Sequence, residues 1–597
     1  MPIHAALTSC RQTGFSLLWR FCVIPVVFDN CRGWLHARTE VGDSRLRIGA
    51  STRGVIVCGA HGFEDLCSRS SLRLLAEEIS ARGLPVLRFD WRGTADSEGD
   101  GEAPHRVATW LGNIGEAARK LVEMTGVEEI VLIGLRLGAL LALEAARDIA
   151  PVRLVLLAPP ASGRALKREL EVMSRIFQGK PGAGEDAGFD GVSAAGFRIS
   201  RETLDDLVLV GSRRFAGAKT CATLVLTQNA DGSPLVDKLR DMGANVVAEP
   251  FEGYAEMMCD PTAALPPAKA IGRIANFVCE GATVAPAHAT LADPAILATD
   301  MWREEAAQFG PDERLVGVYC QSVAVERPSS AVVFLNSGGV YHIGWARMFV
   351  DMARHLAESG VASLRMDMSG VGDSLSPLGP DRAPLFDRSL TRDVEAAIDW
   401  LFSRGVRDVS LVGACSGAYQ AFHAAIEDKR VTKIALVNQS CFVYGPTYAM
   451  QIEAWRRTKA ADMTMKLASA EGPADAEPKG ARALLFSLAK KVVKAGLVHA
   501  TDAAFAIRRL APGLNPVERW FGELAARGAQ TLLIYSENDP GLSELERHLG
   551  DRGRAAAPLP GVRTTTIPDS DHELTPQAAR RALSAALDAF VAEQKAA

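Results

Sequence analysis

Cys415 lies at the centre of a short pattern that is suited to nucleophilic chemistry. The segment reads Gly413-Ala414-Cys415-Ser416-Gly417, after an apolar run and before a helix-forming stretch. A nucleophile flanked in this way by glycines is typical of a sharp strand-to-helix turn, where a Cβ on either side would clash. A thiol performs this role once a base makes it a thiolate, and the start of the following helix favours that anion. The alternative is that Cys415 is a buried filler and that Ser416 is the nucleophile.

A carboxylate and a histidine follow at the places where such a nucleophile needs them. Asp539 comes after the apolar run 531–535, and His572 comes after the run 564–567. We predict that His572 takes the thiol proton and that Asp539 orients its ring and stabilises the imidazolium. Glu537 is the fallback acid. Three other histidines of this half are expected to be ordinary surface or helix residues: His342, His423 and His548.

An oxyanion formed at Cys415 needs two backbone N–H groups aimed at it. One is expected from Ser416, the residue after the nucleophile, and one from the loop Ser337-Gly338-Gly339-Val340, which follows an early apolar run. We assign the second donor to Val340, because the glycines before it allow close backbone approach.

The elements that position these residues belong to an internal repeat. The stretch 54–97 aligns without gaps with the stretch 331–374, which begins 277 residues later, so that Asp90 matches Asp367 and Asp96 matches Asp373. Each copy has an apolar run, a Gly-rich turn, a helical segment and another apolar run, which predicts a strand–helix–strand unit. A repeat of this length indicates two whole domains rather than a solenoid.

The fold class is therefore α/β, with two tandem domains that each hold a mostly parallel central sheet flanked by helices. We expect an N-terminal tail over 1–30, a first domain over 31–280, an Ala/Pro-rich linker over 281–300 and a second domain over 301–597. Long insertions at about 162–219 and 443–529 predict helical caps. The second insertion holds an acidic, Pro-containing segment, EGPADAEPKG, that suits a mobile lid.

The first copy serves as an internal control for the chemistry. Its elbow reads Gly134-Leu135-Arg136-Leu137-Gly138, Asp231 takes the place of the acid, and Tyr254 takes the place of His572. Arginine is charged at every relevant pH and is no nucleophile, so we predict that this domain is inactive in this chemistry. Arg136 either forms a structural salt bridge, with Asp231 or Glu256, or binds an anionic group of a ligand.

Composition excludes several classes of protein. The 597 residues are 48% hydrophobic and 23% charged with a net charge of −5, which is ordinary for a globular protein and gives no sign of nucleic-acid binding. Eleven cysteines occur without metal-binding spacing, and the odd number argues against a complete disulfide framework, so we expect a reducing cytoplasm. The apolar segment 17–28 contains Arg20 and Pro25 and is too short to span a bilayer, which favours a tail or strand over a signal peptide or anchor.

With these motifs in hand, the chain resembles the α/β-hydrolase superfamily, nearest the serine aminopeptidase-like and exosortase-associated hydrolases. The resemblance rests on the elbow, the Ala60-His61-Gly62-Phe63 turn and the matching segments RFDWRGTADS and RMDMSGVGDS. The cysteine at the elbow is similar to that of dienelactone hydrolases, whose triad is Cys, Asp and His. The exosortase-associated resemblance implies a link to bacterial polysaccharide or secondary-metabolite biosynthesis.

Together these features predict a hydrolase or acyltransferase that attacks an ester or thioester carbonyl through Cys415, His572 and Asp539 by way of an acyl-enzyme. The substrate is expected to be a small-molecule or carrier-bound acyl group. We expect no metal or organic cofactor, no nucleic-acid partner, no stable membrane insertion, and an intramolecular pseudo-dimer of the two domains. The alternative is a non-catalytic binding or scaffolding pseudoenzyme of a biosynthetic pathway.

Overall fold

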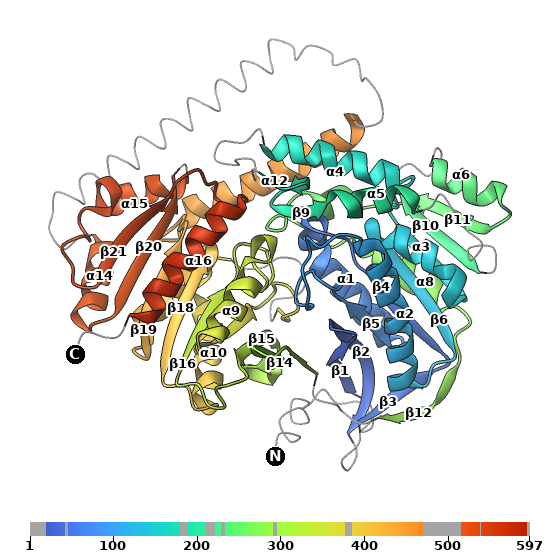
Figure 1. Ribbon diagram of the computed structural model, residues 1–597, viewed down its shortest axis with the longest axis horizontal. Coiled ribbons are helices and arrows are strands. Elements are labelled where there is room, and N and C mark those ends of the chain that lie inside the picture. Colours follow the sequence, from blue (N-terminus) through green and yellow to red (C-terminus); the bar gives the residue numbers. More distant parts are fainter. Residues whose placement is uncertain are drawn as a thin grey trace, which may run out of the picture.

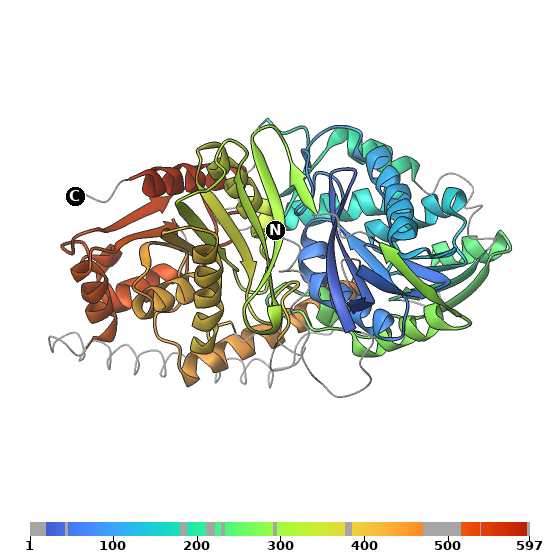
Figure 2. The ribbon, with the colours of Figure 1, turned by 90° about the horizontal axis from the view of Figure 1, so that it is seen from below.

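The chain folds into two α/β domains that lie side by side (Figures 1 and 2). The computed structural model describes residues 20–41, 46–178, 188–210, 221–228, 233–290, 295–376, 385–469, 515–537 and 539–593. Each domain has a central sheet with helices on both faces, as the alternation of apolar strands and helices predicted (Figure 1). No helix within these ranges combines the length and the apolar character that crossing a membrane requires.

The first sheet has ten strands within the described ranges, in the order β11-β10-β7-β6-β4-β5-β2-β3-β12, with β1 paired to β2. Its strands are β1 (Arg20–Phe28), β2 (Cys31–Val41), β3 (Leu46–Ser51), β4 (Arg53–Cys58), β5 (Val86–Phe89), β6 (Glu129–Leu135), β7 (Arg153–Leu157), β10 (Ala222–Thr227), β11 (Asn245–Pro250) and β12 (Val284–Thr290). The helices of this domain are α1 (Phe63–Ala81), α2 (Arg106–Thr125), α3 (Leu137–Ile149), α4 (Gly163–Gln178), α5 (Arg201–Leu209), α6 (Pro234–Asp241), α7 (Tyr254–Met258) and α8 (Ala268–Cys279).

The second sheet has nine strands within the described ranges, in the order β13-β14-β15-β17-β16-β18-β19-β20-β21. Its strands are β13 (Ile296–Ala298), β14 (Trp302–Phe309), β15 (Leu315–Ser322), β16 (Ser330–Leu335), β17 (Ala362–Asp367), β18 (Asp408–Ala414), β19 (Val431–Val437), β20 (Gln530–Ser536) and β21 (Val562–Ile567). The helices of this domain are α9 (Met348–Glu358), α10 (Thr391–Ser403), α11 (Ser416–Glu427), α12 (Pro446–Ser469), α14 (Pro516–Ala526), α15 (Gly541–Leu549) and α16 (Gln577–Ala592).

The two sheets share one topology. The parallel strands β5-β4-β6-β7-β10-β11 of the first domain follow the same order as β17-β16-β18-β19-β20-β21 of the second. An antiparallel strand, β2 or β15, flanks each set. The sequence repeat therefore corresponds to two copies of one fold, and equivalent loops lie at the carboxyl ends of equivalent strands.

Two predicted boundaries need correction. Residues 20–28, for which a tail or a strand was expected, form the strand β1, which pairs antiparallel with β2, so the first domain begins before residue 31. Pro25 is compatible with a strand here, since β1 lies at an edge and needs donors on one side only. The expected linker, 281–300, contributes β12 to the first sheet through pairing with β3, and β13 to the second sheet through pairing with β14.

The two caps differ in how much of them the structure describes. The first insertion folds as α4, α5 and a hairpin of β8 (Gly191–Ala194) and β9 (Phe197–Ser200). The second insertion contributes α12, which runs from the second domain toward the first (Figure 1), and α14. The acidic segment EGPADAEPKG lies outside the described residues.

The domains meet through reciprocal ion pairs between matching positions of the repeat. Arg365 of the second domain lies 2.9 Å from Asp96 of the first, and Arg88 of the first lies 2.7 Å from Asp373 of the second. All four side chains are buried. Because each pair uses the same two repeat positions, the contact has the self-complementary character of a two-fold interface.

His342 links the same network, and here the sequence-based expectation was wrong. It was expected to be a surface or helix histidine, but it is fully buried between Asp96 and Asp367, at 2.6 Å and 2.9 Å from its two ring nitrogens. Burial alone lowers the pKa of an imidazole, but these two carboxylates outweigh it and raise the pKa of His342 to about 10. His342 is therefore a buried cation that both domains hold.

Candidate active site

Cys415 occupies a strained turn between β18 and α11. Its backbone has φ 54° and ψ −112°, which a residue with a side chain rarely adopts. The turn is possible because its neighbours are glycines: a Cβ on Gly413 would lie 2.1 Å from the Gly417 carbonyl oxygen, and one on Gly417 would lie 2.4 Å from the Asn336 carbonyl oxygen. The thiol is half-buried rather than enclosed, as a nucleophile that must meet a substrate requires.

Asp539 and His572 come together at the carboxyl ends of the last two parallel strands. Asp539 follows β20 and His572 follows β21, and Asp539 Oδ2 lies 2.6 Å from His572 Nδ1. The other oxygen of this buried carboxylate accepts a hydrogen bond from the Gly541 amide at 2.6 Å. The carboxylate is thereby fixed, and it holds the imidazole with Nε2 directed away from it.

The imidazole of His572 is electrostatically linked to Cys415. Burial alone lowers the pKa of His572, but the charge of Cys415 and the hydrogen bonds with Asp539 and Cys415 outweigh burial, so the pKa lies well above its usual range. His572 is thus linked both to Asp539 and to Cys415, which are the two contacts that a base serving a nucleophile needs.

Asn438 supports these loops, although the sequence analysis assigned it no role. It follows β19 with φ 47°, and its side-chain amide donates to the His572 carbonyl at 2.8 Å. Its Oδ1 accepts from the Ser536 amide at 2.7 Å, and Ser536 Oγ donates to the Asp571 carbonyl at 2.7 Å. The available signal was an asparagine directly after an apolar run, because asparagine tolerates positive φ better than most residues.

The side chain of Ser416 is hydrogen-bonded to the loop that follows β16. Its hydroxyl is buried and accepts a hydrogen bond from the Gly338 amide at 3.0 Å. The backbone N–H of Ser416 opens α11, where a helix leaves its first amides without internal partners, and the Cys415 side chain forms no cap there. The geometry thus favours Cys415 over Ser416 as the nucleophile and keeps the Ser416 N–H as the candidate oxyanion donor.

The predicted second donor, Val340, is engaged elsewhere. Its amide donates to the Ser337 carbonyl at 3.0 Å, which closes a turn within the loop. The Gly339 amide donates to Thr262 Oγ1 of the first domain, also at 3.0 Å. The prediction that the Val340 N–H donates to an oxyanion is therefore corrected for this conformation, because that N–H is hydrogen-bonded within the loop.

The fallback acid and the two remaining histidines of the sequence analysis have other partners. Glu537 is exposed and accepts from the Asp569 amide at 3.2 Å, so it does not replace Asp539. His423, on α11, lies 3.0 Å from the Phe442 carbonyl, and His548, on α15, lies 3.2 Å from Glu544. Both are helix histidines, as expected, but they are buried.

A small polar and aromatic group borders the thiol on its other side. Ser440 Oγ lies 3.8 Å from Cys415 Sγ and accepts from the Tyr448 hydroxyl of α12 at 3.1 Å. Three rings pack around Phe386 at centroid distances of 5.2–5.6 Å: Tyr419, Tyr444 and Tyr448. Sequence periodicity did not single out this cluster, because its members come from separate segments.

Arg136 occupies the equivalent turn of the first domain and is neutralised there. Its Nε lies 2.7 Å from Glu64, its Nη2 is ion-paired with Glu169, and its Nη1 donates to the Ala158 carbonyl at 3.2 Å. This favours the structural role, with partners other than Asp231, which lies outside the described residues, or Glu256. Burial raises the pKa of the nearby Tyr254, which replaces the histidine and stays a neutral phenol.

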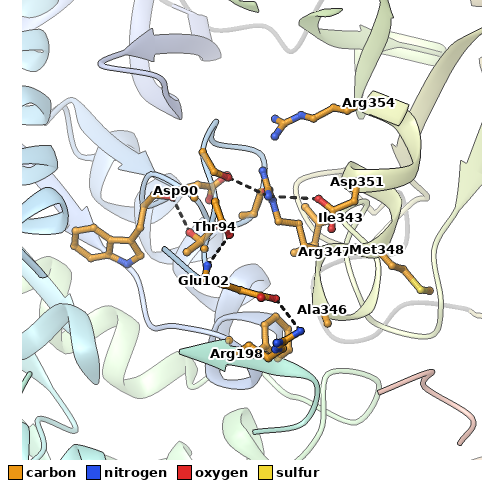
Figure 3. Close-up of a pocket in the computed structure, with 18 of the residues that line it drawn as sticks. Asp90, Thr94, Glu102, Arg198, Ile343, Ala346, Arg347, Met348, Asp351 and Arg354 are labelled. Carbon is orange, nitrogen blue, oxygen red and sulfur yellow. Dashed lines mark hydrogen bonds and ion pairs between the residues drawn. The ribbon is translucent and has the colours of Figure 1, made fainter. Parts of the chain in front are cut away.

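A cavity of about 780 Å³ lies between the domains, apart from Cys415 (Figure 3). Its walls include the following charged and polar side chains: Asp90, Thr94, Glu102, Arg347, Asp351 and Arg354. Arg347 reaches across and donates to the Ala95 and Ser97 carbonyls, both at 2.7 Å. The cavity therefore belongs to the domain interface.

The fold and the geometry define two α/β-hydrolase domains, of which the second holds a cysteine, a histidine and an aspartate in triad order. Residues 332–586 match the family model described as "Alpha/beta hydrolase family", and residues 51–185 match "Serine aminopeptidase, S33". Each domain thus matches an α/β-hydrolase model over the stated residues, and these matches support a hydrolytic enzyme. No curated protein matches the chain.

Among solved structures, an esterase from Pyrococcus furiosus is 12% identical over 48% of this chain and 90% of that chain, with a TM-score of 0.31. A dienelactone hydrolase from Anabaena variabilis is 16% identical over 46% of this chain and 90% of that chain, with a TM-score of 0.28. A membrane phospholipase A, described as a bacterial virulence factor, is 20% identical over 49% of this chain and 88% of that chain, with a TM-score of 0.30.

Proposed function

We propose that the protein is a hydrolase or acyltransferase that acts on an ester or thioester carbonyl through Cys415, His572 and Asp539. The observation that carries the proposal is the strained elbow thiol, linked by charge and hydrogen bonding to an imidazole that Asp539 holds at 2.6 Å. A site that had lost its chemistry would have no need of this pairing, and the first domain, with Arg136 and Tyr254 at the same positions, lacks it.

The reaction follows from the charges. The Cys415 thiolate attacks the carbonyl carbon, and the oxyanion of the tetrahedral adduct accepts from the Ser416 N–H. The adduct collapses as the His572 imidazolium gives its proton to the leaving alcohol or thiol, which leaves an acyl-thioester on Cys415. Neutral His572 then takes a proton from water or an acceptor alcohol as that oxygen attacks, and collapse releases the acid or new ester and restores the thiolate–imidazolium pair.

The surroundings of the thiol favour an acyl group with an apolar part. Tyr448 donates a hydrogen bond to Ser440, which lies 3.8 Å from the thiol, and the ring of Tyr448 packs on Phe386. Aromatic side chains of this kind bind apolar groups. The acyl group would reach this wall as a small-molecule ester or on a carrier thiol.

We further propose that the first domain is a pseudo-hydrolase that packs on the second as an intramolecular pseudo-dimer. The reciprocal pairs Arg365–Asp96 and Arg88–Asp373 support this arrangement. We also propose a location in a reducing cytoplasm, because the eleven cysteines have no metal-binding spacing and their odd number argues against a complete disulfide framework.

Turnover of a panel of p-nitrophenyl esters and acyl-thioesters of increasing acyl length tests the proposal. We expect hydrolysis, or transfer to an added alcohol, that is lost in Cys415→Ala and reduced by at least about a hundredfold in His572→Ala. Absence of turnover across the panel, or equal turnover by Cys415→Ala, would favour the binding or scaffolding pseudoenzyme instead.

A further inference from the structure

The first domain touches the oxyanion loop of the second at two successive glycines. The Gly339 amide donates to Thr262 Oγ1 at 3.0 Å. A Cβ on Gly338, whose φ is +58°, would lie 2.2 Å from that hydroxyl oxygen, and a Cβ on Gly339 would lie 2.1 Å from the Pro261 carbonyl oxygen. The glycine pair therefore admits a segment of the other domain, in addition to forming a turn.

The internal repeat identifies the residues of the first domain that match the glycine pair. The position that matches Gly338 in the first copy is His61, and the position that matches Gly339 is Gly62. The second copy has thus lost the side chain at the point where Thr262 approaches.

Thr262 is itself held on two sides. Its amide donates to Asp260 Oδ1 at 2.9 Å, which fixes the segment locally. Its carbonyl accepts from Arg456 Nε of the cap helix α12 at 3.2 Å, and Lys459 of the same helix lies 3.8 Å from Asp260. The hydroxyl of Thr262 thus engages the oxyanion loop while its carbonyl engages the cap.

The oxyanion loop is also hydrogen-bonded to the turn that carries Cys415. Gly338, next to Gly339, donates its amide to Ser416 Oγ at 3.0 Å. Ser416 directly follows Cys415, and its own N–H is the candidate oxyanion donor. A continuous path of hydrogen bonds and adjacent residues therefore runs from Thr262 through the glycine pair to the residue that would stabilise the tetrahedral adduct.

We infer that Thr262 is a positioning residue for the catalytic centre of the second domain, so that the first domain, inactive by itself, completes the active site of its neighbour. The inference rests on the proposed function, because it assigns Thr262 to the support of an oxyanion. Loss of its hydroxyl leaves the Gly339 N–H without its acceptor and frees the loop, which slows formation of the tetrahedral adduct.

The test compares two reactions of Cys415 in the full chain: acylation by an activated ester, which passes through an oxyanion, and alkylation by iodoacetamide, which does not. Thr262→Val removes the hydroxyl at nearly constant volume, and Thr262→Ser keeps it. We expect acylation of Thr262→Val to slow by about tenfold, the equivalent of one net hydrogen bond, with alkylation at the Cys415 peptide unchanged and acylation restored in Thr262→Ser.

The outcomes separate this inference from the proposed function. Equal acylation of the native protein and Thr262→Val overturns the inference alone, and so does a parallel fall of acylation and alkylation, since a merely structural role affects both. An alkylated native protein that no ester acylates overturns the proposed function as well. If Thr262→Val fails to fold, Gly339→Ala, whose Cβ meets the Pro261 carbonyl, is expected to give the same selective loss of acylation, and unchanged acylation there contradicts the inference.

Discussion

Cys415 and Arg136 share one backbone conformation in the two halves of the chain, with φ 54° at both positions and ψ of −112° and −113°. The first domain has kept the strained turn while replacing the nucleophile by a residue that cannot attack a carbonyl. Backbone strain of this kind persists where the surrounding structure enforces it. The tight glycine approach is also shared, since a Cβ on Gly134 would lie 2.3 Å from the Gly138 carbonyl oxygen.

Removal of the Arg136 charge is expected to affect stability and not chemistry. Arg136→Met leaves the partly buried carboxylate of Glu64 without its ion-pair partner, which is expected to lower the free energy of unfolding by about 1–3 kcal/mol. Urea unfolding should show this loss, while native Arg136→Met still forms an acyl adduct at Cys415. Stabilisation of the native protein by millimolar phosphate or acetate, absent in Arg136→Met, would instead support an anion site.

The acid of the triad is expected to be Asp539 and not Glu537. Asp539→Asn changes which ring nitrogen of His572 carries the proton, so acylation should fall by on the order of 10³-fold. Glu537→Gln is the matched control, because its carboxylate is exposed and bonds to Asp569, and it should acylate at the native rate. The reverse ranking of the two variants in stopped-flow acylation would contradict the assignment.

Ser416 is expected to contribute through its position rather than as a nucleophile. In Ser416→Ala the Gly338 amide loses its acceptor, so acylation should slow by about tenfold or less. Peptide mapping should still find the acyl group on Cys415. Complete loss of the adduct in Ser416→Ala, with retention in Cys415→Ala, would reverse the roles of the two residues.

Stability of the domain interface is expected to fall at alkaline pH because of His342. Its pKa is raised from the ordinary 6.5 to about 10 in the folded protein, so the folded state holds a proton that the unfolded state releases above pH 6.5. The stabilisation is complete below that pH and is lost at up to about 1.4 kcal/mol per pH unit as the pH rises toward 10.

Urea unfolding between pH 6 and 10 measures this dependence. His342→Gln should be less stable at pH 6 and should show a shallower decline than the native protein. An identical slope in both proteins would show that His342 is not the titrating group.

The architecture was predictable from the sequence, and so was the contact between Asp539 and His572, because each rests on local patterns in fixed chain order. Apolar runs and glycines mark strands and turns within a few residues, and the fold determines where the loops after β18, β20 and β21 meet. The repeat also showed that the first copy has the same glycine-flanked turn, with Arg136 in the place of Cys415.

The contacts that the sequence did not reveal join residues far apart in the chain. Arg136 pairs with Glu64, 72 residues away, and His342 with Asp96, 246 residues away. Val340 was misassigned because its amide is used by a local turn, while its neighbour Gly339 is bonded to Thr262, 77 residues earlier in the other domain. No local pattern encodes which partners the amides of such a loop take.

Intact-mass analysis after incubation with an activated ester tests the central claim most directly. The native protein should gain the mass of one acyl group, Cys415→Ala should gain none, and His572→Ala should gain it slowly. A native protein that gains no mass, or a Cys415→Ala variant that gains as much as the native protein, would contradict covalent catalysis at Cys415.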